Sequence, residues 1–559
     1  MNFIKRIGTL LAVIAMAFSL SFTSKVEAAT GHTFVVDQQD DGYTYLLYEM
    51  LTGDTSVNSE GKVVLSNVKW GNGVKQDTIT KLYETLTSRE GKPINSPGTF
   101  ADWLSTQPES VFHDLLSIMG GTSSGESLQN GIRLNLGTYP VNGENVTGYG
   151  ITGLKDGYYL VRNTAIPTGD GKTYSDYIVS VVNSDIVVNT KASVPSSDKS
   201  TAEKNDSTSS SIEGQKTADY DIGDSIPFTL SIILPTNYAQ YSSYRLIIID
   251  DISAGLTWNG DAKIYFGNSD TTGHPITFFD KTGETVPAEG DKSITVTSKY
   301  TGGKVMVMDY DDLKKAAGAE NLKAGDRITV KYSATLNSNA AADNYGNRNS
   351  FHINYSNDPT VRTHVGSTPD TETIIFTYKT IFNKTDGNNA LTGADFTLEK
   401  LIAGSGSDSV TINDKNYTGT WKDVTALNIG EDAVNPVKTG DTSSSTFTFT
   451  GIDAGVYRLS ERVTPAGYNT IDPIPFVITA THHYDAGSNG LTNLTGTDGN
   501  TFTMTMDENN HAIISADVVN KKGVVLPTTG GSGTTMFYVI GSILVVGAGI
   551  LLITKKRIQ

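Results

Sequence analysis

The C-terminus of this 559-residue chain carries the feature that most restricts how the rest can fold. An apolar run from Met536 to Ile553 is followed by the basic residues Lys555, Lys556 and Arg557. The run is close to the ~20 residues that a membrane-spanning helix needs, and the basic tail would hold its end in the cytoplasm. We therefore expect everything before Met536 to fold on the outer side of a membrane.

A short motif, Leu526-Pro527-Thr528-Thr529-Gly530, stands just before the apolar run. Pro527 favours an extended peptide that an enzyme groove can hold, and Gly530 leaves the Thr529–Gly530 amide open to attack. In this order and at this end of a chain, the motif resembles the LPxTG cell-wall sorting signal of Gram-positive surface proteins, which sortase transpeptidases read. The simpler alternative is an ordinary C-terminal membrane anchor.

The N-terminus has the pattern of an export signal. The short basic segment 1–6 is followed by the mostly apolar segment 7–22. Small residues at Val26 and Ala28 have the spacing that a signal peptidase recognises, which predicts a signal peptide over 1–28. Export at one end agrees with anchoring at the other.

Composition narrows the class of protein further. The chain has no cysteine, so disulfides cannot stabilise it outside the cell. Its net charge of −17 argues against nucleic acid as a partner, since phosphate binding needs a basic surface. The 56 glycines, with recurrent β-branched residues and turn signals, are typical of β-sandwich modules.

Changes in composition divide the exported part into three predicted domains, at 29–190, 191–370 and 371–522, followed by the sorting signal at 523–559. Apolar residues with helical spacing near 81–86, 99–104 and 111–119 predict a helical insertion in the first domain. Alternating and continuous apolar runs predict strands elsewhere. The expected fold class is mainly β, with tandem sandwich domains.

Strand parity identifies three polar residues that end apolar stripes in the third domain, because side chains alternate faces along a strand. Lys384 shares a face with Phe376, Tyr378 and Phe382; Glu461 with Tyr457 and Leu459; Asn520 with Ile514, Ala516 and Val518. One interpretation is a buried Lys–Glu salt bridge capped by an amide, which costs several kcal/mol per charge in desolvation.

The other interpretation is covalent. A desolvated lysine has a lowered pKa and becomes a nucleophile, while a desolvated carboxyl can relay protons. Lys384 would attack the side-chain carbonyl of Asn520, ammonia would leave, and Glu461 would act as the acid–base group. The product is an isopeptide bond that joins the first and last strands.

The segments 383–387, 391–398 and 457–468 resemble a CnaB-type immunoglobulin-like domain of Gram-positive pilins and adhesins. In that family a lysine, the glutamate of the "E-box" and a late asparagine form this bond. The resemblance implies the same roles for Lys384, Glu461 and Asn520.

The second domain resembles the isopeptide-forming, CnaA-type middle domain of fimbrial shaft proteins, through 220–224, 251–257 and 355–359. The resemblance implies a reactive lysine, an aspartate at Asp251 and a late asparagine at Asn357. Asn357 shares strand parity with Phe351, Ile353 and Tyr355. Lys199 fits the position of the reactive lysine best, and Lys204 is the second candidate. The simpler alternative is that both are solvated linker lysines.

Where an E-box would stand in the first domain, Arg162 and Asn163 occupy the positions of a glutamate. We therefore expect no isopeptide bond there.

Resemblance to shaft pilins over nearly the whole chain implies an acceptor lysine at the end of the first domain. Lys191 has the right position, although the surrounding motif matches weakly. The expected function is a major pilin subunit joined by a pilus-specific sortase from Thr529 to Lys191 of the next identical subunit, with minor pilins and peptidoglycan as further partners. The rival is a monomeric wall-anchored adhesin or minor pilin that binds a host ligand.

Other signals are weak. The pair His482-His483 lacks metal spacing and is expected to face solvent in a loop. The acidic turns at 37–41 and 498–500 lack a calcium-ligand pattern. No catalytic motif, resident metal or cofactor is expected, and the pilin would supply only substrate groups to the sortase.

Overall fold

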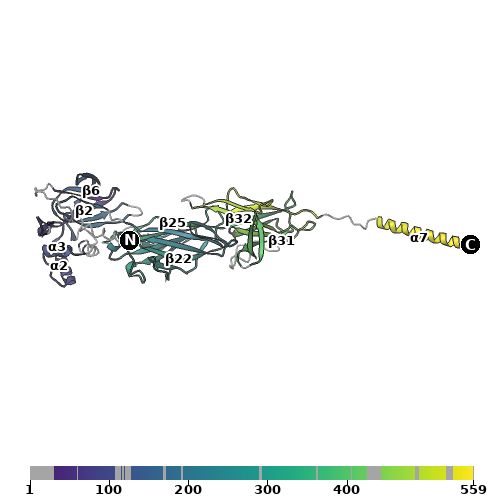
Figure 1. Cartoon of the computed structure of the whole chain (residues 1–559), viewed down its shortest axis with the longest axis horizontal. Helices are drawn as coiled ribbons and strands as arrows, with labels where there is room; N and C mark the ends of the chain where they lie inside the picture. The colour runs from purple at the N-terminus through teal and green to yellow at the C-terminus, as the bar shows by residue number, and fades with distance from the viewer. Residues whose placement is uncertain are drawn as a thin grey trace.

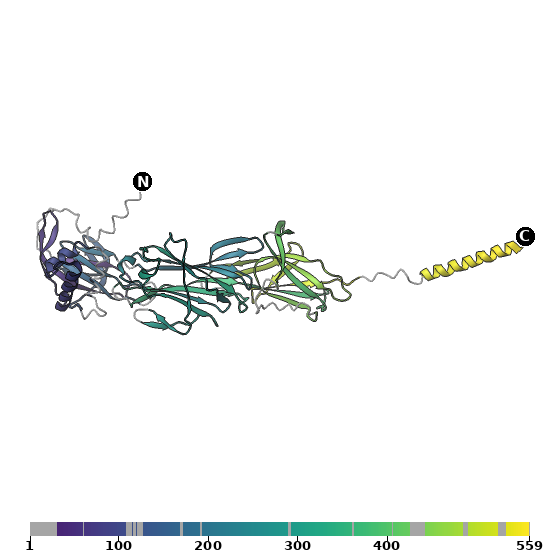
Figure 2. The ribbon, with the colours of Figure 1, turned by 90° about the horizontal axis from the view of Figure 1, so that it is seen from below.

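The computed structural model describes residues 31–59, 61–107, 115, 119, 127–167, 172–189, 193–288, 292–359, 363–404, 406–424, 442–484, 490–523 and 533–557. Three β-rich domains follow one another in a row (Figures 1 and 2), and the helix α7 (Gly533–Arg557) lies beyond the third. Within α7, the segment Met536–Lys556 is long and apolar enough to cross a membrane, with a mean hydropathy of 2.5.

Within the described residues, the first domain has two sheets and the helices α2 and α3, which enclose two hydrophobic clusters. One sheet has the order β5 (Asn135–Val141), β6 (Glu144–Leu154), β1 (His32–Asp37), β9 (Ile186–Asn189). The other has the order β3 (Val63–Trp70), β2 (Thr44–Val57), β7 (Gly157–Ala165), β8 (Asp176–Val181), with β4 (Ile132–Arg133) beside β2. Apolar side chains such as Phe34 and Val161 fill the space between the sheets.

The helices α2 (Gln76–Glu90) and α3 (Pro97–Leu104) cover the second of these sheets through Leu82, Leu86 and Phe100. The start of α3 is fixed by Ser96, whose hydroxyl accepts the Thr99 amide proton at 3.2 Å. The expected helical insertion is therefore present. Its third predicted segment, 111–119, lies outside the described residues apart from Leu115 and Met119, which are buried.

The second domain is a sandwich of two larger sheets. One has the order β11 (Ser210–Gln215), β10 (Ser196–Asn205), β13 (Ser225–Ile233), β22 (Arg327–Leu336), β16 (Lys263–Phe266), β17 (His274–Pro275), with β15 (Leu256–Trp258) beside β22. The other has the order β12 (Thr217–Asp219), β25 (Thr371–Phe376), β23 (Asn347–Ser356), β14 (Leu246–Ile252), β21 (Lys304–Tyr310), β18 (Phe279–Asp280), with β24 (Val365–Ser367) beside β23.

Strand β14 is buried along its whole length, as its continuous apolar run predicts. Its even-numbered residues Leu246 and Ile248 face the main core between the sheets. Its odd-numbered residues Ile247 and Ile249 face a smaller cluster formed with Val286, on the hairpin of β19 (Thr285–Pro287) and β20 (Ser293–Thr295).

The third domain is one long sheet that wraps around its core. The strand order is β28 (Asp408–Ile412), β29 (Lys415–Asp423), β27 (Asp395–Ile402), β31 (Gly455–Val463), β32 (Ile474–His482), β33 (Leu491–Thr497), β34 (Thr503–Met506), β35 (Ile513–Val519), β26 (Tyr378–Thr385), β30 (Thr446–Ile452). The first strand, β26, and the last, β35, pair in parallel, with Lys384 opposite Val518.

The junction between the second and third domains differs from the sequence prediction. The predicted division at 370/371 places the whole apolar run 375–384 in the third domain. Instead, β25 ends at Phe376 and pairs with β12 and β23 of the second domain, while β26 starts at Tyr378 in the third. The chain therefore passes between the domains at Thr377, because the two halves of this apolar run are buried in different sheets.

Candidate functional site: two buried lysine clusters

Lys384, Glu461 and Asn520 come together in the third domain. Lys384 lies near the end of β26, Glu461 lies on β31, and Asn520 follows β35 directly. The parallel pairing of β26 with β35 brings the lysine beside the asparagine, although 136 positions separate them in the chain. The alternation of β31 points Glu461 into the same core as Tyr457 and Leu459, which are fully buried.

The atoms of this cluster are in contact. The Lys384 ammonium nitrogen lies against Oδ1 of Asn520 and 3.8 Å from Oε1 of Glu461. Nδ2 of Asn520 donates to the same Glu461 oxygen at 2.9 Å. The other oxygen, Oε2, accepts the Ile471 amide proton at 3.0 Å, which fixes the orientation of the carboxyl group.

Water is excluded from the cluster, since the side chains of Lys384 and Glu461 have no exposed surface. Burial lowers the pKa of Lys384 to about 8, and the nearby charge of Glu461 opposes this shift. The ring of Phe396 lies 5.7 Å from the amine nitrogen. A lysine in this environment has a much larger neutral, nucleophilic fraction than a surface lysine.

A second cluster is centred on Lys199 of β10, whose side chain is completely buried. Its amine nitrogen contacts Oδ1 of Asp250, donates to Oδ1 of Asn349 at 2.6 Å and to the Tyr332 hydroxyl at 2.9 Å. The Tyr332 hydroxyl also contacts Asp250 and accepts from Nδ2 of Asn349 at 2.7 Å. The cluster thus contains the amine, carboxyl and amide groups of the third-domain cluster, with a tyrosine added.

Burial lowers the pKa of Lys199 to about 8, against the opposing charge of Asp250. The rings of Phe228 and Tyr332 lie 5.3 and 5.4 Å from the amine nitrogen. Of the two lysines weighed from the sequence, Lys199 enters the core, while Lys204, five positions further along the same strand, is exposed.

Two residues expected in the second-domain cluster lie elsewhere. Asp251 points to the opposite face of β14, where its carboxylate accepts from the Ser298 hydroxyl at 2.6 Å and the Lys299 amide at 2.8 Å. Because β14 is buried on both faces, the apolar pattern could not tell Asp250 from Asp251. The neighbouring Asp250 is the residue that reaches Lys199.

Asn357 has the correct strand parity but lies beyond the wrong end of β23. Its backbone carbonyl accepts from the Tyr174 amide at 2.7 Å and the Thr173 hydroxyl, so it contacts the first domain. Asn349, on the same face as Phe351 and Ile353, lies near the other end of the strand and contacts Lys199. Only the pairing of β23 with β14, which places Asn349 opposite Ile252, distinguishes the two.

In the first domain, Arg162 forms a buried ion pair with Asp176 at 3.2 Å, and Asn163 is buried beside it. Lys191 and the motif 526–530 lie outside the described residues, as does the signal segment 1–28.

The prediction for His482 was wrong in part. His482 ends β32 and is half-buried against the second domain, with Nδ1 2.9 Å from the Thr217 hydroxyl and Nε2 3.4 Å from Asp219. Its neighbour His483 is exposed, as expected.

In the acidic turn after Thr497, Asp498 accepts backbone amide protons from Asn500 and Phe502. In the turn at 37–41, Asp41 accepts from the Gly42 amide.

The fold and these clusters define a class of protein: tandem β-sandwich domains with buried lysine–carboxyl–asparagine groups, followed by an apolar C-terminal helix. Residues 379–489 match the SpaA family, described as a prealbumin-like fold domain, and residues 518–559 match the LPXTG cell wall anchor motif.

Similar proteins are surface proteins and pilins. The chain is 25% identical over 468 residues to the trypsin-resistant surface T6 protein of Streptococcus pyogenes serotype M6, which covers 75% of this chain and 80% of that protein. Similar solved structures include the T6 backbone pilin of Streptococcus pyogenes serotype M6, with 16% identity, a TM-score of 0.48, and coverage of 89% of this chain and 100% of that one. The major pilin SpaD from Corynebacterium diphtheriae has 14% identity, a TM-score of 0.41, and coverage of 89% and 99%.

The two matched segments and the similarity to the T6 surface protein confirm the resemblance to Gram-positive major pilins that the sequence predicts. The anchor motif, followed by the apolar helix α7, makes the chain a cell-wall-anchored surface protein.

Proposed function

We propose that the chain is the shaft subunit of a covalently polymerised pilus and that two intramolecular isopeptide bonds stabilise it. The observation that carries the proposal is the pair of buried clusters around Lys199 and Lys384, each with an amide oxygen and a carboxyl group in contact distance. Both clusters are arranged for the same reaction, and both lie between the acceptor end and the sorting end of the chain.

In the third domain the neutral amine of Lys384 attacks Cγ of Asn520. A new C–N bond forms, the bond from Cγ to Nδ2 breaks, and ammonia leaves. Glu461 donates a proton to the departing Nδ2, which it already contacts, and takes one from the Lys384 nitrogen, so that it ends in its starting state. Each bond forms once per chain, so the reaction is a maturation step without turnover.

In the second domain Lys199 attacks Asn349 in the same way, with Asp250 as the proton-relaying carboxyl and Tyr332 bridging the carboxyl and the amide. The proposal replaces Asp251 and Asn357 by Asp250 and Asn349, because only the latter pair contacts Lys199.

Polymerisation is then the work of a pilus-specific sortase. Its thiolate attacks the Thr529 carbonyl carbon, the Thr529–Gly530 bond breaks, and the Gly530 amine leaves. The amine of Lys191 on the next subunit attacks the resulting thioester, which releases the thiolate. Attack by the amine of a peptidoglycan precursor instead anchors the finished fibre, to which minor pilins are added.

The intact mass of the mature 29–529 chain tests the isopeptide part. We expect the mass calculated from the sequence less two ammonias, with cross-linked peptides that contain Lys199–Asn349 and Lys384–Asn520. A loss of one ammonia would remove one of the two bonds from the proposal. The unmodified mass would leave both clusters as buried salt bridges.

Surface extracts test the polymer part. We expect a high-mass ladder in cells that express the natural chain, and its loss in the Lys191→Arg variant, while the Lys204→Arg variant keeps it. A single band from the natural chain would favour the rival function of a monomeric wall-anchored adhesin.

A further inference from the structure

A third buried lysine lies at the junction between the second and third domains. Lys400, on β27 of the third domain, donates to Oδ1 of Asp453 and Oδ2 of Asp221, each at 2.6 Å. Asp221 belongs to the second domain, where it precedes β13. A further second-domain carboxylate, that of Asp206, lies 3.5 Å from the amine nitrogen. The Lys400 side chain is fully buried, so this charge cluster joins two domains without solvent between them.

The backbones of the two domains are also in contact around Lys400. The Asp453 amide donates to Asp221 at 2.9 Å, and the Ile222 amide donates to the Gly451 carbonyl at 2.9 Å. Gly451 has φ +83°, and a side chain there would meet Ile222 at 2.4 Å, so the close approach of the domains requires glycine. The Ala403 amide donates to the Asp206 carbonyl at 2.8 Å.

Lys400 differs chemically from the two lysines that we propose to react. Its described contacts are carboxylates and the ring of Tyr457, with no asparagine amide among them. The charges of Asp221 and Asp453 outweigh burial and raise the pKa of Lys400 well above its usual value, whereas the pKa values of Lys199 and Lys384 are lowered. Lys400 is therefore held as an ammonium ion, which is not a nucleophile.

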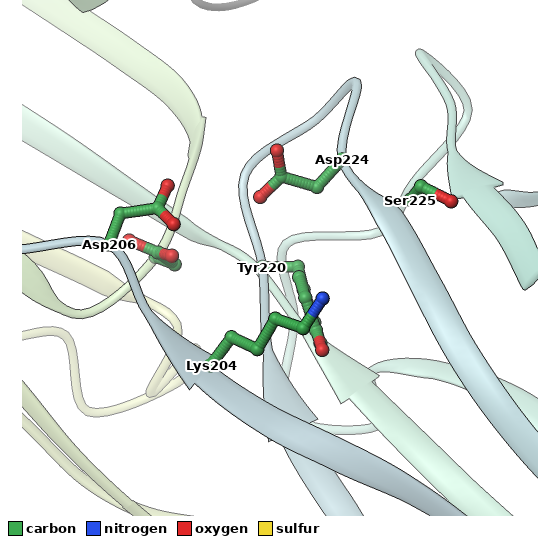
Figure 3. Close-up of a pocket in the computed structure, with 6 residues that line it drawn as sticks. Lys204, Asp206, Tyr220, Asp224 and Ser225 are labelled. Atoms are coloured by element: carbon green, nitrogen blue, oxygen red, sulfur yellow. The ribbon is translucent and has the colours of Figure 1, made fainter. Parts of the chain in front are cut away.

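Next to this cluster lies a polar cavity of about 120 Å³ (Figure 3). Asp206 and Asp224 face it from two turns of the second domain, and Lys204 and Tyr220 line its floor. Asp453 also lines it. The acidic groups around Lys400 thus border a polar cavity.

The position of Lys400 matters because of the path that tension takes through a cross-linked subunit, and this step rests on the proposed function. Tension that enters at Lys191 reaches Lys199 along β10, crosses to Asn349, and continues along the chain to Lys384. It then crosses to Asn520 and leaves toward Thr529. The two crosslinks bypass residues 200–348 and 385–519, so these segments carry no load.

Residues 350–383 are the long stretch between the crosslinks that bears load without a covalent bypass. They include most of β23, all of β24 and β25, and most of β26, and they cross the domain junction at Thr377. Non-covalent pairing alone holds β25, with β23 on one side and β12 on the other. For β25 to be pulled out, the second and third domains must separate, because β26 begins two residues after β25 ends.

We propose that the Lys400–Asp221–Asp453 cluster is a non-covalent mechanical latch, which keeps β24, β25 and the adjoining parts of β23 and β26 in their sheets when the subunit is under tension. The latch spans the junction in parallel with the load-bearing chain. Opening it separates opposite charges that are desolvated, and it leaves Asp453 and Lys400 without the Asp221 carboxylate. The fully buried lysine makes this contact resistant to screening by salt.

Single-molecule stretching of the cross-linked 29–529 chain, held at positions 191 and 529, tests the latch. When the segment opens, roughly 35 residues extend at ~3.4 Å each, which gives a step of up to about 120 Å. We expect this step at a clearly lower force in the Lys400→Met variant than in the natural chain. The matched control, Lys415→Met, removes an exposed lysine of the same domain and is expected to leave the force unchanged.

Intact mass separates failure of the latch from failure of the proposed function. The Lys400→Met and Lys415→Met chains must each show the loss of two ammonias. If the Lys400→Met chain does not, the Asp221→Asn variant, which keeps the lysine, takes its place. An equal opening force in the cross-linked Lys400→Met and natural chains would overturn the latch. A loss of one water in addition to two ammonias in the natural chain would also overturn it, because Lys400 would then be covalently bound to an aspartate. A step much longer than about 120 Å in the natural chain, with unmodified mass, would instead refute the crosslinks.

Discussion

Replacing Glu461 by glutamine gives the sharpest test of the third-domain crosslink. Glutamine keeps the shape of the side chain and an oxygen that can accept from Nδ2 of Asn520. It cannot relay protons between Lys384 and the leaving amide nitrogen. We therefore expect the Glu461→Gln chain to retain one more ammonia than the natural chain.

The expected loss of stability follows from the length of the loop that the bond closes. Lys384 and Asn520 are 136 positions apart. The chain-entropy model for a crosslink that closes such a loop gives about 5 kcal/mol at 25 °C. Replacing Glu461 also removes the interaction that opposes the effect of burial, so the pKa of Lys384 is expected to fall further and the neutral form of the lysine is favoured.

For a domain of this size, about 5 kcal/mol corresponds to a decrease of the third-domain melting temperature of roughly 10–20 °C. Differential scanning calorimetry measures it, and intact mass on the same sample reports the bond. The matched control is Glu399→Gln, which removes a partly exposed carboxylate that pairs with Arg458 at 2.7 Å on the neighbouring strand. The control is expected to cross-link fully and to melt within a few degrees of the natural chain.

Two results would refute this reasoning. Full loss of ammonia in Glu461→Gln would show that the carboxyl group is not needed for the reaction. An uncross-linked Glu461→Gln chain with the melting temperature of the natural chain would show that the bond does not constrain the unfolded state as the model assumes.

Two further predictions concern the second domain. The Asp250→Asn chain is expected to lose one ammonia fewer than the natural chain, because Asp250 contacts Lys199. The Asp251→Asn chain is expected to lose both ammonias, because Asp251 lies on the other face of the strand. The reverse result would restore the assignment of Asp251 that was based on sequence alone. Burial and the charge of Asp221 raise the pKa of Asp224 to about 7. A raised carboxyl pKa means that stability is lost as the pH rises from about 4 to about 7, so Asp224→Asn should be more stable than the natural chain at pH 8 and equal to it near pH 4. After allowance for its partial exposure we expect about 1–2 kcal/mol at pH 8, measured by urea unfolding, and a difference independent of pH would contradict the assignment.

Much of the third-domain cluster could be predicted from the sequence because each of its residues ends an apolar stripe with one buried face. The alternation of strands β26, β31 and β35 therefore fixes the face on which Lys384, Glu461 and Asn520 lie. The β-sandwich fold class was also predicted from alternating apolar residues. The helical insertion was predicted from apolar residues with helical spacing around 81–86 and 99–104. The anchor at the C-terminus needed only a linear motif and the length of an apolar run.

The second-domain cluster required the tertiary structure. Strand β14 is buried on both faces, so a hydrophobic pattern carries no information about whether Asp250 or Asp251 faces Lys199. Parity selected the correct face of β23, but Asn349 and Asn357 share that face, and only the register against β14 decides which end meets the lysine.

The contacts of Lys400 at the junction between the second and third domains were still harder to predict from the sequence. Asp221, Lys400 and Asp453 are separated by 179 and 53 positions and belong to two domains. Strand periodicity describes how side chains are distributed about one strand, and it says nothing about which domain packs on which. The sequence by itself determined the sandwiches, the anchor and the residues of the third-domain cluster, whose signals are local. Only the packing of sheets and domains decided the partners of Lys199 and Lys400, because those contacts depend on register and docking over long separations.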